Sequence, residues 1–181
     1  TGCADGTAAF QRDVVAQYQP EVVVWLSAWE SVDRFLDGAW VRFGSFAGNP
    51  RIVAEIDEAV QRLTAGGGRL VVVIPAPVPP GAEAEDHDAV ARLPHLSTVL
   101  REYARQHADR VFVVEMAELL CPDGPPCPTT IGGYGPRPDG MHFDDPAGAR
   151  WAADWLISKV LAPVTPPAPT AGRTTAGVGA A

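Results

Sequence analysis

The sequence has little of what would tie a protein to a bilayer or to a polyanion. No stretch of its 181 residues approaches the roughly 20 consecutive apolar residues of a membrane span. Its opening residues, TGCADGTAAF, lack the basic region and the apolar core of a signal peptide. Positive charge is in deficit: the net charge of −8 and pI near 4.9 disfavour nucleic acid or an anionic membrane surface as a partner. The 46% hydrophobic and 20% charged residues that remain are typical of one globular domain.

Cysteine is scarce as well, with three in the chain. Cys121 and Cys127 bracket Pro-Asp-Gly-Pro-Pro, an insert that favours a turn and therefore a close approach of the two Cα atoms. Two interpretations stand: a pair of free thiols in a cytoplasmic loop, or a disulfide that stabilises the loop by about 2 kcal/mol. We favour the disulfide, because both cysteines lie in a Pro/Gly-rich loop. Cys3 is left without a partner, and we expect its partner to lie upstream of residue 1.

Apolar periodicity predicts alternating helices and strands. Continuous apolar runs rich in β-branched residues indicate strands over 22–26, 70–74 and 111–114. Helical spacing indicates helices over 4–19, after Asn49-Pro50, around 96–103 and after Asp145-Pro146, with Phe10, Val14 and Tyr18 on one face of the first. This order predicts a doubly wound parallel α/β sheet in a single domain over residues 1–162. Residues 163–181 form a Pro/Ala-rich tail that we expect to be disordered.

The candidate chemistry lies where these strands end, because sites in open α/β sheets form beyond the carboxyl ends of the strands. Ser27–Glu30 and Pro75–Pro77 leave the first two strands, and a loop over 121–143 follows the third. In that loop Asp139 precedes His142 by three residues, and such a pair can form the base half of a Ser-His-Asp triad. The alternative is a Pro-Asp-Gly turn beside a solvated histidine.

The run Leu-Leu-Cys-Pro … Cys-Pro … Arg-Pro-Asp-Gly-Met-His-Phe, ahead of a C-terminal helix, resembles the SGNH (GDSL-like) hydrolase superfamily. The Trp29-Glu30 pair and the cysteine loop are most similar to the SGNH domains associated with membrane acyltransferases of the acyltransferase-3 type. The resemblance implies a three-layer α/β/α, flavodoxin-like fold and an extracytoplasmic esterase or O-acyltransferase acting on O-acyl groups of cell-surface glycans. It implies no cofactor and no metal, and as partners an acylated glycan or other ester and a membrane acyltransferase domain encoded upstream.

The resemblance also implies roles for individual residues. Asp139 is the triad acid and His142 the general base. The segment Ser27–Glu30 corresponds to the family's Gly-x-Asn-Asp block, with Ser27 at the Gly position and Trp29 at the Asn position that donates to the oxyanion. An indole N–H can donate one hydrogen bond but is far bulkier than an amide. Arg137 either pairs with Asp139, contacts an anionic substrate or is an ordinary surface residue.

The family's nucleophile motif, Gly-Asp-Ser at the end of its first strand, is absent from these residues. We therefore expect a domain truncated at its N-terminus that lacks the first strand, exposes an apolar sheet edge and is poorly stable alone. The catalytic serine would come from outside this sequence. The alternative is a catalytically inactive fragment that binds a glycan or a partner.

Two further patterns are weaker. Trp40, Phe43 and Phe46 surround a Gly-rich stretch and are typical either of a sugar-stacking wall or of ordinary loop packing. A zinc site at Cys121, Cys127 and His142 is disfavoured, because Cys-x5-Cys is looser than the spacing of structural zinc sites.

Overall fold

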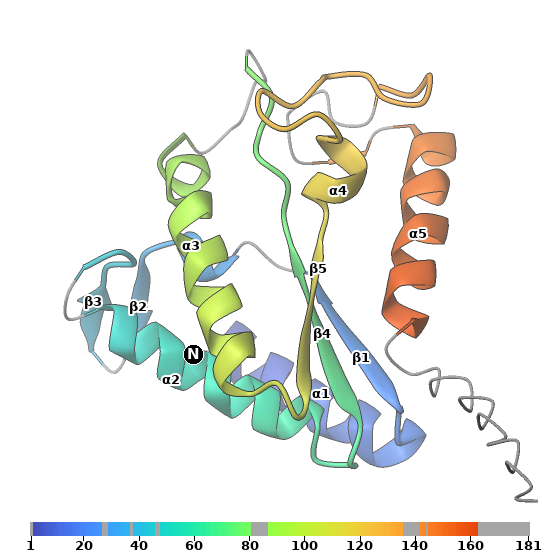
Figure 1. The fold of residues 1–181 in the computed structure, drawn as a ribbon. Coiled ribbons are helices and arrows are strands. Elements are labelled where there is room, and N and C mark those ends of the chain that lie inside the picture. The colour runs from blue at the N-terminus through green and yellow to red at the C-terminus, as the bar shows by residue number, and fades with distance from the viewer. Residues whose placement is uncertain are drawn as a thin grey trace, which may run out of the picture.

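The computed structural model describes residues 2–26, 29–36, 38–45, 48–80, 87–135, 142–143 and 145–162. The expected tail over 163–181 lies outside this part. In chain order (Figure 1) the elements are α1 (Gly2–Tyr18), β1 (Val22–Leu26), the 3-10 helix η1 (Trp29–Ser31), β2 (Arg34–Leu36), β3 (Ala39–Val41), α2 (Gly48–Leu63), β4 (Arg69–Ile74), α3 (His87–Gln106), β5 (Val111–Glu115), α4 (Ala117–Leu120) and α5 (Pro146–Leu161).

The three predicted strands form one parallel sheet, in the order β1-β4-β5. Val24 lies opposite Val71, which in turn lies opposite Phe112 on β5. The middle strand β4 is buried from Leu70 to Ile74, as its continuous apolar sequence predicts for a strand covered on both faces. The protein is therefore of the mixed α/β class with a parallel sheet.

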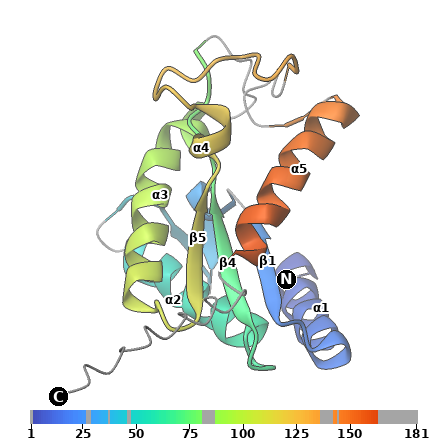
Figure 2. The same cartoon turned by 45° about the vertical axis from the view of Figure 1, so that its right-hand side comes forward.

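Helices cover both faces of this sheet, as Figures 1 and 2 show. Alternate residues of β4 divide between two layers: Leu70, Val72 and Ile74 pack with α2 and α3, whereas Val71 and Val73 face α5. Most of the apolar residues expected to face inward on the two larger helices are buried: Ile52, Ile56 and Val60 on α2, and Leu96, Leu100 and Tyr103 on α3. Leu63 and Val99, expected on the same faces, are half-buried. Helix α3 begins earlier than expected, at His87, and contains Pro94.

Helix α1 packs against α2 rather than on the sheet. The side chain of Arg62 on α2 donates to Gln11 on α1, over 3.3 Å from Nε to Oε1. Val15 of α1 is buried, while Phe10 and Tyr18 are each 68% exposed. The apolar face predicted for this helix is therefore wrong by one position, because α2 covers the side that carries Val15.

The outer edge of β1 has no neighbouring strand among the residues that the structure describes. The strand reads Val-Val-Val-Trp-Leu and contains neither the charge nor the proline that protects natural edge strands. On the face turned to α5, Val24 is 43% and Leu26 61% exposed. Strand β1 thus presents an open, apolar edge.

Candidate functional site at the carboxyl edge of the sheet

The carboxyl ends of β4 and β5 are joined directly: the backbone N–H of Met116 donates to the carbonyl of Ile74 over 3.0 Å. Strand β4 continues into Pro75-Ala76-Pro77, of which Ala76 is buried, and β5 turns at once into the short helix α4. In an α/β sheet this edge is where ligands bind. The residues that follow β4 and β5 are thus held together by this hydrogen bond and by burial.

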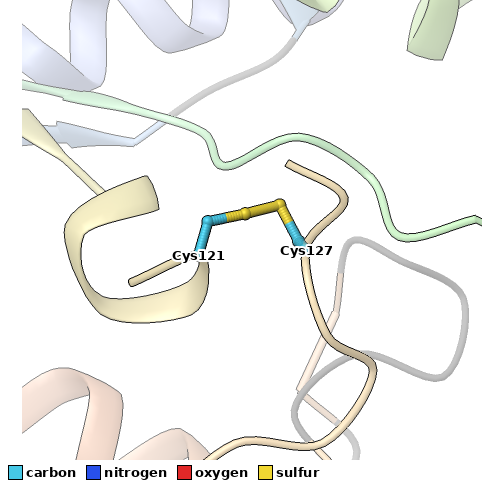
Figure 3. The surroundings of a disulfide bond; sticks show 2 residues. All are labelled: Cys121 and Cys127. Carbon is cyan, nitrogen blue, oxygen red and sulfur yellow. A yellow bond between two sulfur atoms is a disulfide. The ribbon is translucent and has the colours of Figure 1, made fainter. Parts of the chain in front are cut away.

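The loop that follows α4 is closed by the Cys121–Cys127 disulfide, shown in Figure 3. The two Cα atoms are 4.7 Å apart, and both side chains are buried. The turn between them uses Gly124 at φ +82°, a conformation that favours glycine, and its N–H donates to the carbonyl of Cys121 over 2.9 Å. Of the two interpretations of these cysteines, the structure contains the disulfide.

Phe143 fixes the position of the chain next to His142. Its half-buried side chain packs into a cluster with Val73, Ala76 and Met116, which lie at or just beyond the ends of β4 and β5. His142 itself is exposed. The neighbouring phenyl ring therefore holds His142 at the edge of the sheet where chemistry is expected.

The start of α5 holds the other end of this segment. Asp145 is the N-cap, and its Oδ1 accepts a hydrogen bond from the N–H of Ala147 over 2.9 Å, with Pro146 in the first turn. The helix start predicted from Asp145-Pro146 is confirmed. Helix α5 therefore begins within four residues of His142.

The proposed partners of His142 lie outside the described residues. Asp139 and Arg137 belong to residues 136–141, and Ser27 to residues 27–28. For Trp29 the structure describes the main chain, in η1. The pairing of Asp139 with His142 and the oxyanion role of Trp29 stay predictions.

Glu30, the last of the predicted site residues, is 8% exposed in η1. The described residues provide neither a hydrogen bond nor an ion pair to its carboxylate, so it is a nearly buried acid after β1. However, η1 contacts α3, whereas Phe143 packs toward α5 on the opposite face of the sheet. The structure brings His142 to the ends of β4 and β5 and places Glu30 on the other side.

Two polar anchors near this edge were missed in the sequence. Asp33, just after η1, accepts from Arg92 on α3 over 2.7 Å and from the backbone N–H of Phe43 over 3.0 Å. Arg101 forms a bidentate ion pair with Glu115 at the end of β5: its Nε donates to Oε1 over 2.6 Å and its Nη2 to Oε2 over 2.8 Å. The hydrogen bond to Glu115 raises the pKa of Arg101, and the last carboxylate of β5 is thereby committed to an ion pair. Such partners are far apart in sequence, so no local motif announces them.

Within the described ranges, no three His, Cys, Asp or Glu side chains come together in a way that could hold a metal ion. Across the same ranges, no helix combines the length and the apolar character needed to cross a bilayer.

Fold and site together define a class: an α/β protein whose parallel sheet presents a histidine beside its carboxyl edge. No protein-family model matches the chain, and no curated protein sequence matches it significantly.

Proposed function

We propose that the protein is an SGNH-type ester hydrolase or O-acyltransferase domain with a flavodoxin-like α/β/α fold, acting on O-acyl groups of cell-surface glycans. The observation that carries the proposal is the packing of Phe143 against the ends of β4 and β5, immediately after His142 and immediately before α5. A general base in an α/β hydrolase is needed at this edge. The motif Asp-Gly-Met-His-Phe supplies both the base and the ring that anchors it.

In this proposal His142 accepts the proton of a serine hydroxyl as the serine oxygen attacks the ester carbonyl. It then gives that proton to the departing sugar oxygen, and an acyl-serine remains. Water or a sugar hydroxyl attacks the acyl-serine in the second half, again through His142, so that the acyl group leaves as an acid or as a new ester. Asp139 holds the imidazole in the tautomer that leaves Nε2 free to accept. No cofactor or metal takes part.

The serine of this mechanism comes from a polypeptide segment outside the 181 residues, since none of the five serines follows a Gly-Asp pair. The open edge of β1 supports the proposal. A strand added there brings its own carboxyl end to the same edge of the sheet, and its side chains cover Val24 and Leu26. Ser27 and Trp29 are proposed as oxyanion contacts and Arg137 as a substrate contact. Glu30, which lies toward the opposite face of the sheet from His142, is not retained as a substrate contact. The proposed location is extracytoplasmic, where a disulfide such as Cys121–Cys127 persists. The proposed partner domain is a membrane acyltransferase.

The second candidate is a non-catalytic module that binds a glycan or a partner. It is favoured by the absence of a Gly-Asp-Ser motif from the sequence. A triad without its nucleophile retains little of its rate advantage.

Ester hydrolysis separates the two candidates. The protein is assayed on p-nitrophenyl acetate and on an acetylated polysaccharide, with and without the residues encoded upstream of Thr1 in the same reading frame. We expect activity in the extended protein and a loss of roughly a thousandfold in His142→Ala. His107→Ala is the matched control, because His107 precedes β5 at the opposite end of the sheet. Equal rates in extended wild type and His142→Ala, or no activity in the extended protein, would leave the binding module as the better account.

A further inference from the structure

The connection between β1 and α2 carries a small hairpin whose outward face is aromatic. Strands β2 and β3 pair antiparallel, and Phe35 lies directly opposite Trp40. The two rings are 5.8 Å apart between centroids and inclined by 70°, an edge-to-face arrangement. Phe35 is 61% and Trp40 68% exposed. A hairpin of this kind ordinarily turns polar residues outward, so an outward face made of two aromatic rings is unusual.

The inner face of the hairpin is anchored to two helices. Val41 is buried in the core between the sheet, α2 and α3. Arg34 pairs with Glu55 on α2 over 3.0 Å, and Asp33 at the base of β2 pairs with Arg92 on α3 over 2.7 Å. Figure 1 shows the hairpin held beside these two helices. The aromatic pair therefore sits on a fixed support, and a ligand that binds it does not have to order it first.

We propose that Phe35 and Trp40 form a stacking platform for a neutral sugar ring of the glycan. This inference rests on the proposed function, whose substrate class it deepens. An aromatic face carries negative charge density, and it attracts the weakly positive C–H groups that line one side of a pyranose ring. The indole N–H adds a donor for a sugar hydroxyl. In the edge-to-face pair, at least one ring keeps a face that the other does not cover.

Charge favours a neutral glycan over the other ligands that aromatic surfaces bind. Phe35 and Trp40 carry no charge, and Arg34, which neighbours Phe35, is already paired with Glu55. The chain as a whole carries a charge of −8, which repels an anionic membrane or a nucleic acid and leaves a neutral polysaccharide unaffected. The hairpin also leaves the carboxyl end of β1, the end of the sheet at which the ester chemistry is proposed.

The test is retardation in native gels that contain acetylated glucomannan or dextran, both neutral. We expect wild type to be retarded, Trp40→Ala to bind at least about tenfold more weakly and Phe35→Ala to fall between them. Trp40→Phe, which keeps an aromatic ring, is expected to retain most of the retardation. Tyr18→Ala is the matched control, because Tyr18 is also 68% exposed but lies on α1. Thermal melts of each variant show whether it is folded.

Several results would overturn the platform. The first is no retardation of wild type in either polysaccharide. The second is equal retardation of wild type and folded Trp40→Ala. The third is a loss of retardation in Tyr18→Ala as large as that in Trp40→Ala. Sedimentation of the protein with phosphatidylcholine vesicles that depends on Trp40, without sugar binding, would assign the face to a membrane instead. The gel measures binding without turnover, so its outcome is independent of the ester assay. Sugar binding with no His142-dependent hydrolysis would leave the platform standing and reject the catalytic proposal.

Discussion

Breaking the Cys121–Cys127 disulfide tests how the candidate edge is held together. The bond closes a loop with a sequence separation of 6. The chain-entropy relation for a loop of this size gives about 2 kcal/mol at 25 °C. For a domain of this length each kcal/mol corresponds to roughly 2–4 °C in melting temperature, so we expect reduction to lower it by about 4–8 °C. The apolar cluster that contains Leu120 and Phe143 should lose its packing first on heating. The reason is that Leu120 directly precedes Cys121, so the disulfide is the covalent link nearest to this cluster.

The assay is a thermal melt of protein reduced in urea and refolded with a phosphine reductant, compared with oxidised protein. All samples carry Cys3→Ala, so that the shift belongs to the Cys121–Cys127 pair. A Cys121→Ala/Cys127→Ala variant should melt low and be insensitive to the reductant. If alkylation and mass spectrometry show both cysteines reduced and the melting temperature is unchanged, the loop is held by its packing and the entropic estimate is refuted.

Two further variants test polar contacts of the core helices and the hairpin. In Tyr103→Phe we expect a loss of about 1 kcal/mol at pH 7, because the Tyr103 hydroxyl donates to Asp57 over 2.8 Å. Burial and the carboxylate raise the pKa of Tyr103, so wild-type stability should also fall as the pH rises above the ordinary tyrosine value of about 10. Urea denaturation between pH 7 and 11 should show a smaller alkaline loss in the variant, and parallel curves would contradict this assignment. Asp33→Ala removes the hydrogen bonds that Asp33 accepts from Arg92 and from the N–H of Phe43. We expect the free energy of unfolding to fall by about 1–2 kcal/mol and the retardation by polysaccharide to weaken. Unchanged retardation would show that the platform does not need this anchor.

The sheet was predictable because its strands are continuous apolar runs. Residues 22–26, 70–74 and 111–114 were expected, and β1, β4 and β5 agree within one residue at each end. The N-cap at Asp145 was equally visible, since Asp-Pro before an apolar period is a strong local signal. Signals of this kind need no knowledge of the rest of the fold.

The hairpin and its anchors could not be predicted in this way. Strands β2 and β3 each span three residues, too few to show an alternation, and the ion pairs that hold them join segments far apart in sequence. Of the aromatic residues for which a sugar-stacking wall and ordinary loop packing were both considered, Trp40 is exposed, whereas Phe43 is buried in the core. Phe46 lies outside the described residues, and Phe35, the actual partner of Trp40, was missed. Tertiary contacts decide which ring faces the solvent.

In the candidate site, too, some features follow from local sequence and others from tertiary contacts. The motif around His142 fixes its order along the chain, and the packing of Phe143 fixes where that stretch meets the sheet. Glu30 and His142 both follow the strand ends in sequence, yet they lie toward opposite faces of the sheet. The order of residues along the chain predicts the edge of the sheet at which a side chain lies. The face of the sheet on which it lies depends on how the helices pack.

Because of the way the hairpin is attached, substitutions of its outward rings and substitutions in the hydrophobic core have separate effects in evolution. Its tip turns at Gly38, while its base is fastened by residues whose partners belong to α2 and α3. Replacing the two outward rings therefore alters what the protein recognises without disturbing the parallel sheet. A lineage bearing this fold could exchange ligands by changing a few surface positions while its hydrophobic interior stayed the same.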